Sequence, residues 1–185
     1  MSFDDDFGEV LEASRAGAAW ALTSVYRELH PPILRYLRAM EASEADDLAA
    51  ETWVDVVRSL EHFQGDELGL RAWAFTIARR RLLDFRRTRA RRQTDPTAPE
   101  ELGELGGTGD VEREALDALD TQAALARIAT LPHDQAEVIL LRVLGGLPTE
   151  QVALIMDKRP GTIRVLQHRA LQRLARDISV ETVTP

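Results

Sequence analysis

The chain has 185 residues, no cysteine and a formal net charge of −8. Its length allows one ordinary domain or two small ones, and the absence of cysteine excludes disulfides and thiolate metal sites. The acidic N-terminus, MSFDDDFGEV, leads into no long apolar run, so we expect no signal peptide and no membrane insertion, and we place the protein in the cytoplasm.

Charge is distributed unevenly along the chain. Residues 1–67 carry 15 acids and 5 bases, whereas residues 68–92 carry 9 arginines and a single acid, Asp84. Residues 93–121 are again strongly acidic, and residues 122–185 are weakly basic. Because binding to a polyanion depends on local potential rather than on total charge, segment 68–92 predicts contact with nucleic acid.

Helical periodicity covers most of the chain and strand alternation is nearly absent, so we expect an all-α protein with two packed units. The first helices are expected over residues 19–30 and 33–40, separated or kinked at Pro31 and Pro32. Residues 44–63 predict one amphipathic helix with an acidic exposed stripe. The turn FQGDELGL then leads into a helix that becomes rich in arginine by Arg79.

Composition changes sharply after Arg92. The stretch RQTDPTAPEELGELGGTGD contains two prolines, four glycines and several acids, which is typical of a flexible linker. We therefore expect a first domain at residues 1–92, a flexible acidic linker at 93–113 and a second domain at 114–185.

The sequence of the second domain predicts a helix-turn-helix. A short helix over Thr149–Met156, a turn and a long helix over Pro160–Arg176 match the DNA-binding unit, whose second helix enters the major groove. In the long helix Ile163, Leu166 and Ala170 share one side, while basic residues share the other. An ordinary surface helix with a solvated basic side is the alternative, but no acid interrupts the run from Lys158 to Arg176.

The segment WAFTIARRRLLDFRRTRARR interleaves aromatic and basic residues. Aromatic faces can stack on exposed bases and guanidinium groups can neutralise phosphates, which is the chemistry of single-strand binding. Alternatively, the aromatic residues form core, and for Trp73 and Phe85 both interpretations stay open. For the arginines a polyanionic partner is favoured, because like charges in one helix repel each other.

These segments resemble extracytoplasmic-function (ECF) sigma factors. FQGDELGLRAWAFTIARRRLLDFRR resembles the family's promoter-melting segment, and ASEADDLAAETWVDVV resembles the polymerase-docking helix before it. LPHDQAEVILLRVLGGLPTEQVALIMDKRPGTIRVLQHRALQRL resembles the second conserved domain. The two matches stand in the expected order and cover about residues 19–92 and 114–176.

The resemblance implies an alternative sigma factor rather than an enzyme, with no cofactor. Such a protein binds core RNA polymerase through the β′ clamp and the β subunit, directs promoter recognition and transcription initiation, and is controlled by an anti-sigma factor. The implied polymerase-binding residues are Asp46, Asp47, Glu51 and Asp55. The implied contacts to the −10 element are Gly65, Asp66, Arg71, Arg79, Arg80, Arg81, Arg86, Arg87 and Arg89, with Gly65, Asp66 and Arg80 at a flipped base. The implied contacts to the −35 element are Arg159, Thr162, Arg164, Val165, His168, Arg169 and Arg173.

The sequence departs from the family pattern at several positions. Arg80 stands where asparagine is most frequent, and Ala50 stands where glutamine is frequent. In the second helix of the helix-turn-helix, Val165 and Leu166 replace a serine and arginine pair. Pro148 takes a position where a serine cap is common, and Thr149 is the substitute N-cap that the sequence offers.

Two rival functions compete with this interpretation. A freestanding helix-turn-helix regulator would bind duplex DNA without polymerase. An enzyme or metal protein would need a cluster of ligands, but Glu-x-x-His spacing and a glycine-rich phosphate loop are absent, and the four histidines are scattered along the sequence. We therefore expect neither a catalytic nor a metal site.

Overall fold

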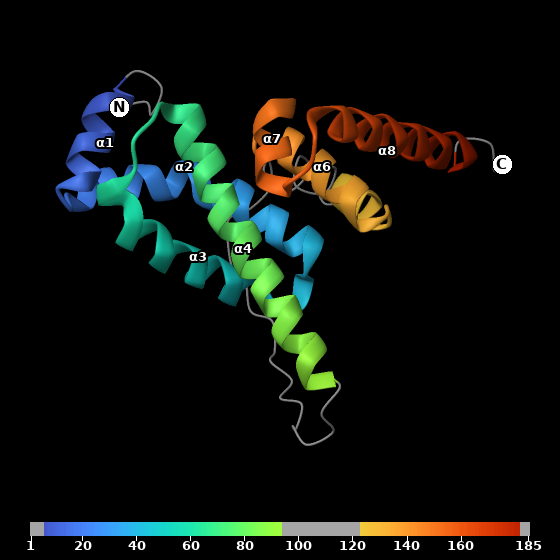
Figure 1. Cartoon of the computed structure of the whole chain (residues 1–185), viewed down its shortest axis with the longest axis horizontal. Coiled ribbons are helices and arrows are strands. Elements are labelled where there is room, and N and C mark those ends of the chain that lie inside the picture. Colours follow the sequence, from blue (N-terminus) through green and yellow to red (C-terminus); the bar gives the residue numbers. More distant parts are fainter. Residues whose placement is uncertain (1–5, 94–122, 182–185) are drawn as a thin grey trace, which may run out of the picture.

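A computed structural model describes residues 6–93 and 123–181, and within these ranges every regular element is a helix (Figure 1). The all-α prediction is therefore confirmed. The predicted linker at 93–113 lies outside the described residues, apart from Gln93, which ends a helix.

The first module is a bundle of four helices with two short 3-10 turns. Its elements are α1 (Phe7–Arg15), α2 (Ala19–Met40), η1 (Ala42–Glu44), α3 (Ala45–Ser59), η2 (Leu60–His62) and α4 (Glu67–Gln93). The apolar stripe of α2 packs on both α3 and α4. Tyr36 and Phe75 are fully buried there, with ring centroids 5.7 Å apart in an edge-to-face arrangement. Phe75 is thus a core residue.

Helix α2 runs unbroken through Pro31 and Pro32, so of the two predicted alternatives, a separation or a kink, the separation is wrong. Proline removes a backbone donor and disfavours a helix interior. Here Leu29, Ile33 and Leu37 are completely buried on one face of α2. Their burial stabilises the helix more than the two lost donors destabilise it, and Pro31 itself is exposed.

The connection between α3 and α4 lies a few residues earlier in the chain than the sequence predicts. Helix α3 ends at Ser59 and α4 begins at Glu67, inside the stretch expected to be a turn. The Oδ1 atom of Asp66 accepts a hydrogen bond from the Gly69 backbone N–H at 2.8 Å, as an N-cap does. This cap explains the early start of α4.

The second module consists of a helix over 123–129, α6 (His133–Val143), α7 (Thr149–Met156) and α8 (Pro160–Glu181). Leu140, Leu147 and Ile163 are fully buried at its centre. Thr149 is the first residue of α7 rather than its N-cap, so that prediction is wrong: Pro148 holds the cap position and makes no side-chain cap bond. Asp157 ends α7 in the left-handed region with φ of 52°.

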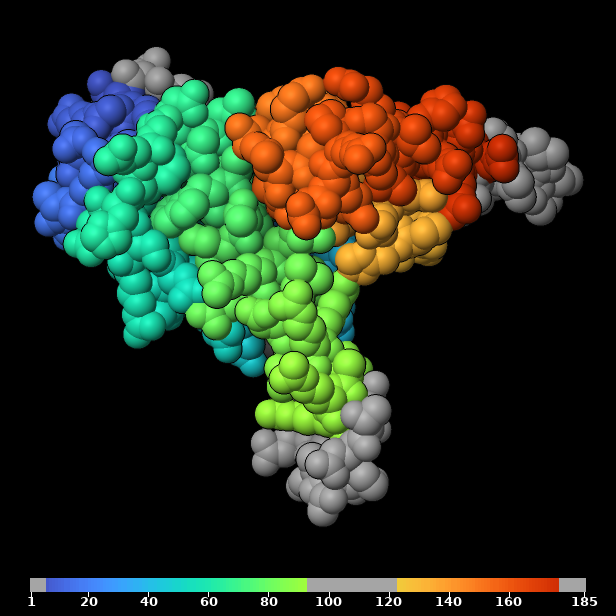
Figure 2. Space-filling model, in the orientation of Figure 1, coloured from blue at the N-terminus to red at the C-terminus, as the bar shows by residue number. Residues whose placement is uncertain are grey.

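The two modules pack against each other. Helix α6 contacts α2, and α7 contacts α4. In Figure 1 the last turns of α4 and the far end of α8 extend away from this junction, and Figure 2 shows the second module seated directly against the first. Both long basic helices therefore remain open over much of their length. No helix of the described part has the length and apolar character needed to cross a membrane.

Candidate functional site

The outer face of α3 carries most of the predicted polymerase-binding acids. Asp46, Asp47 and Glu51 are exposed at the N-terminal half of the helix. Asp55 instead accepts a hydrogen bond of 2.6 Å from Arg81 Nε on α4, and this bond lowers the pKa of the Asp55 carboxyl. Glu51 contacts the same arginine at 3.5 Å but stays exposed, so three of the four acids are exposed on α3 and Asp55 is the partly buried one.

An apolar surface continues from these acids along α3, and the sequence reasoning missed it. Val54 and Val57 are about half exposed. With Ala50, Trp53 and Arg58 they line a shallow depression of about 380 Å³. Two valines three residues apart on an otherwise polar face were the available signal. We name the surface formed by Asp46, Asp47, Glu51, Val54 and Val57 the α3 face.

The arginines of α4 are largely held by acids of the same module. Arg71 contacts Glu28 at 3.1 Å and Glu67 at 2.9 Å. Arg86 and Arg89 both contact Glu41, and Arg87 contacts Asp84 at 3.0 Å. These acids supply the counter-charge that the sequence interpretation assigned to an external polyanion.

Arg80 is the most exposed of the predicted −10 arginines for which an ion pair is described, with 83% of its side chain accessible and its nearest acid, Asp84, at 4.0 Å. It borders a cavity of about 400 Å³ between α3 and α4. The cavity is lined by Asp55, Ser59, Trp73, Ile77, Arg80, Arg81 and Asp84. Trp73, whose role the sequence left open, is half-buried in its wall. Two guanidinium groups, an indole and two carboxylates thus line one open cavity.

Gly65 and Asp66 belong to the turn that precedes α4. The backbone of Gly65 has φ of +154°, and a Cβ there would meet the Phe63 ring at 3.0 Å. The Phe63 ring packs on Trp73 with centroids 5.2 Å apart. Fourteen residues of helix separate Asp66 from Arg80, about 21 Å along the axis. This separation favours contacts of the turn and of Arg80 with different nucleotides, and their assignment to one flipped base stays a prediction.

The helix-turn-helix presents its predicted reading face to solvent. Ile163 and Ala170 are fully buried against α6 and α7, as the apolar side of the predicted helix requires. The predicted −35 residues Arg159, Thr162, Arg164, Val165, His168, Arg169 and Arg173 are all exposed. Arg164 contacts Glu150 of α7 at 3.2 Å. Basic and small side chains thus line one open side of the first turns of α8.

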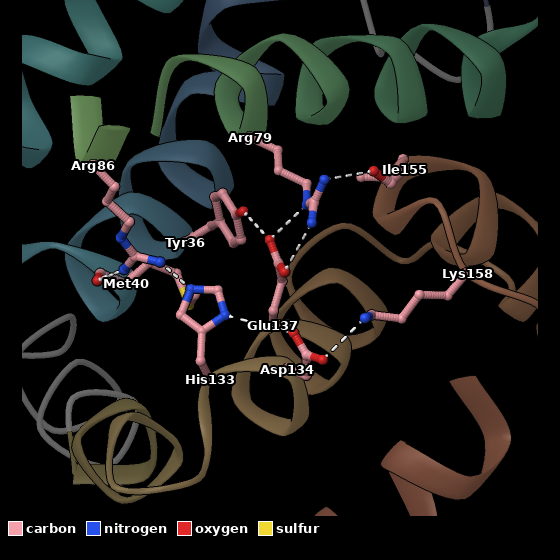
Figure 3. Close-up of polar contacts among 9 residues, drawn as sticks. All are labelled: Tyr36, Met40, Arg79, Arg86, His133, Asp134, Glu137, Ile155 and Lys158. Carbon is pink, nitrogen blue, oxygen red and sulfur yellow. Dashed lines mark hydrogen bonds and ion pairs between the residues drawn. The ribbon is translucent and has the colours of Figure 1, made fainter. Parts of the chain in front are cut away.

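A polar cluster joins the two modules (Figure 3). Glu137 of α6 is fully buried, and its Oε1 atom accepts hydrogen bonds from the Tyr36 hydroxyl at 2.8 Å and from Arg79 Nε at 2.9 Å. Arg79 also donates to the Ile155 carbonyl oxygen at 3.0 Å. Burial, reinforced by the Glu137 charge, raises the pKa of the Tyr36 hydroxyl well above its ordinary value. Arg79, a predicted DNA contact, is thus enclosed between the modules.

His133, Asp134 and Glu137 place ligand atoms within 4.8 Å of one another in this cluster. Each of them contacts a basic side chain, namely Arg86 for His133, Lys158 for Asp134 and Arg79 for Glu137. The Lys158 hydrogen bond lowers the pKa of Asp134. The negative charge that a metal would need is therefore already balanced by protein cations.

Comparison with known proteins agrees with this geometry. Residues 25–92 match the Sigma-70 region 2 family model and residues 121–174 match the Sigma-70, region 4 model. The ECF RNA polymerase sigma factor ShbA of Streptomyces griseus is 32% identical over 177 residues, which cover 90% of this chain and 92% of that protein. The chain belongs to the ECF RNA polymerase sigma factors.

Other relatives are consistent with this assignment. SigD of Mycobacterium tuberculosis is 33% identical to this sigma factor over 183 residues, covering 92% of this chain and 85% of that protein. BldN of Streptomyces coelicolor is 33% identical, and the chain spans 64% of its length. The fold is similar to that of RpoE of Bartonella quintana in its complex with the anti-sigma factor NepR, with a TM-score of 0.65 and 24% identity over 85% of this chain and 96% of that chain.

These matches confirm the predicted family and the two-module fold of the sigma factor. They favour a transcription initiation factor over a freestanding regulator. Region 2 coincides with the helices α2 to α4, and region 4 contains α6, α7 and most of α8. The roles of individual residues remain predictions.

Proposed function

We propose that this sigma factor docks on the β′ clamp and the β subunit of core RNA polymerase and directs the enzyme to promoters in the cytoplasm. One observation carries the proposal: a single chain presents an exposed acidic and apolar face on α3 together with exposed arginines on both α4 and α8. A regulator that bound duplex DNA alone would use the α8 surface and leave the other two without a role. The module bounds in this proposal are 1–92 and 114–185, with 93–113 between them.

The α3 face is proposed as the polymerase-docking surface. Asp47 and Glu51 supply negative charge that steers association, and Val54 and Val57 supply apolar area that becomes buried on binding. Acids at the rim of an apolar centre are the usual anatomy of a protein interface. Asp46 and Asp55 contribute less, because Arg38 and Arg81 hold them at 3.0 and 2.5 Å, whereas the contact of Glu51 with Arg81 is longer, at 3.5 Å.

The cavity beside Arg80 is proposed as the site of one unstacked −10 base. Trp73 offers an aromatic wall and Arg80 an exposed cation. Unstacking a base costs a few kcal/mol and stacking on an aromatic side chain returns roughly 1–3 kcal/mol, so favourable phosphate contacts are needed as well. Arg87 and Arg89, whose side chains are 69% and 52% exposed, supply such contacts when phosphates replace Asp84 and Glu41 as their partners. The turn at Gly65 and Asp66, about 21 Å away, contacts a different nucleotide.

The exposed side of α8 is proposed to read the −35 element. Residues near the N-terminus of a recognition helix reach base edges, and arginines farther along meet phosphates. Thr162 and Val165 are therefore the proposed base contacts, and Arg169 and Arg173 the proposed phosphate contacts. A methyl-bearing Val165 favours apolar contact with a thymine methyl group.

An anti-sigma factor is proposed as a further partner. Both modules expose large apolar side chains, among them Trp20 and Val57 in the first and Leu154 in the second. A protein that covered the α3 face would block polymerase binding directly.

Promoter-specific run-off transcription tests this function. Core RNA polymerase is incubated with genomic promoter fragments, with and without the purified chain. Discrete transcripts that need both the chain and the core enzyme support a sigma factor. Tight duplex binding by the chain alone, with no transcript, would favour the regulator and reject the proposal.

A further inference from the structure

Among the predicted −10 arginines, Arg79 differs in where its partners lie. Both groups that accept its hydrogen bonds, the Glu137 carboxylate and the Ile155 carbonyl, belong to the second module. Arg71, Arg81, Arg87 and Arg89 pair with acids of their own module, and Arg86 contacts Glu41 and the Met40 carbonyl as well as His133. Separation of the modules would therefore free Arg79 and leave those other ion pairs intact.

The buried carboxylate of Glu137 receives its side-chain hydrogen bonds across the same junction between the modules. Its side chain is completely inaccessible, and the two side chains that donate to it, Tyr36 and Arg79, both come from the first module (Figure 3). The Arg79 Nη2 atom also lies 3.5 Å from Glu137 Oε2, so both carboxylate oxygens face the guanidinium. This two-point arrangement is the one that a guanidinium adopts with a phosphate.

We propose that Glu137 acts as an internal substitute for a DNA phosphate, so that the closed arrangement of the modules and the binding of the DNA backbone by Arg79 exclude each other. The inference rests on the proposed promoter binding. It adds that the packing of the two modules regulates this binding. In the free chain, Glu137 and Tyr36 hold the second module over Arg79. A DNA phosphate replaces Glu137 as the anion of Arg79, and the modules separate.

The energetics suit such an exchange. A buried ion pair gains little net free energy over two solvated charges, whereas removal of one partner leaves a costly buried charge. The intact latch, defined as Arg79, Glu137 and Tyr36, therefore holds the modules together without making their separation prohibitive. Replacing Glu137 with alanine shifts the balance toward the open arrangement by about a hundredfold.

The latch is tested first on the free chain, without polymerase or DNA. Because the sequence has no cysteine, spin labels attach only at two introduced ones, Glu61→Cys on η2 and Gln172→Cys on α8, both exposed positions. Electron–electron double resonance is expected to give one narrow distance distribution for the parent chain and a broad one for Glu137→Ala. The control, Glu150→Ala, removes an exposed carboxylate of the same module and is expected to keep the narrow distribution.

Competition is tested with a fluorescein-labelled (dT)-oligonucleotide followed by anisotropy. Glu137→Ala is expected to bind it about tenfold more tightly than Glu61→Ala does. Glu61 is an exposed acid, so this control corrects for the loss of one negative charge without releasing an arginine. In an Arg79→Gln background the same substitution is expected to give no such gain. Tyr36→Phe keeps the core ring and removes one donor to Glu137, and we expect it to broaden the distance distribution to a smaller degree.

An unchanged narrow distribution in both Glu137→Ala and Tyr36→Phe would overturn the latch, as would a gain in affinity that persisted without Arg79. These results are independent of transcription. If run-off transcription fails while both latch measurements succeed, only the proposed function is lost. If transcription succeeds while the latch measurements fail, only this inference is lost.

Discussion

Neighbouring arginines of α4 have very different surroundings, although the sequence presents them as one basic run. Arg79 is enclosed between the modules, Arg81 is held by Asp55 and Glu51, and Arg80 projects into solvent beside a cavity. Three consecutive residues point in three directions because each advances by about 100° around a helix. A count of charges therefore overstates how many arginines are available to DNA.

Replacement of Arg80 with alanine separates promoter melting from stability. Because its side chain is 83% exposed, the change is expected to alter the free energy of unfolding by less than about 0.5 kcal/mol. Loss of a base contact is expected to slow open-complex formation roughly tenfold. Permanganate reactivity of promoter thymines measures the second effect. Arg35→Ala, an exposed arginine of α2, is the control, and equal slowing by both variants would contradict the assignment.

His30 makes the stability of the first module depend on pH. Its Nδ1 atom accepts a hydrogen bond of 2.9 Å from Trp53 Nε1, and its ring stacks on Tyr26. Burial, with a smaller contribution from the Arg38 charge, holds the His30 pKa below its ordinary value of 6.5. The unfolded chain therefore takes up this proton at a higher pH than the folded chain does. Stability is fully present above 6.5 and falls as the pH drops toward the lower folded pKa.

Urea unfolding at about pH 8 and about pH 5.5 checks this dependence. We expect a lower midpoint at the acidic pH for the native chain. His30→Gln can still accept the Trp53 hydrogen bond but does not titrate, so its midpoint should change less. The other histidines are common to both proteins. A pH dependence as steep in His30→Gln as in the native chain would show that His30 is not responsible.

At the level of elements, the sequence predicted the second module better than the first. The bounds of α7 agree with the prediction, and the apolar side of α8 is buried as expected, because turn residues and helical spacing are local signals. The continuity of α2 through two prolines was not predictable locally, since it depends on the burial of Leu29 and Ile33 against α3 and α4. The apolar part of the α3 face and the cavity at Trp73 likewise needed the packed bundle.

Two substitutions in α8 separate support of the helix-turn-helix from reading of DNA. Ile163 is fully buried, so Ile163→Ala is expected to destabilise the second module by about 2–5 kcal/mol. Val165 is 48% exposed, so Val165→Ala is expected to leave stability nearly unchanged and to alter preference within the −35 element. Thermal unfolding and a −35 binding-site selection measure the two effects. A stable Ile163→Ala protein, or an unaltered preference in Val165→Ala, would contradict this division.

At the scale of the whole molecule, many of the charged side chains form ion pairs within the chain. Acids of the first module neutralise much of α4, and Glu137 of the second module neutralises Arg79. The sequence indicated two modules and their order. It could not indicate their junction, because Glu137 lies 101 residues from Tyr36 and 58 from Arg79, and no local pattern links such distant side chains.

Direct titration of fluorescently labelled chain with core RNA polymerase tests the central claim, that the α3 face mounts this sigma factor on the enzyme. We predict saturable binding that Asp47→Ala with Glu51→Ala weakens by about tenfold or more. Two control variants should bind as the native chain does. They are Arg80→Ala and Glu61→Ala, and Glu61 is an exposed acid outside the α3 face. A primary sigma factor confirms that the core enzyme is competent. The account is contradicted if that competent enzyme does not bind the native chain, or binds the doubly substituted one equally well.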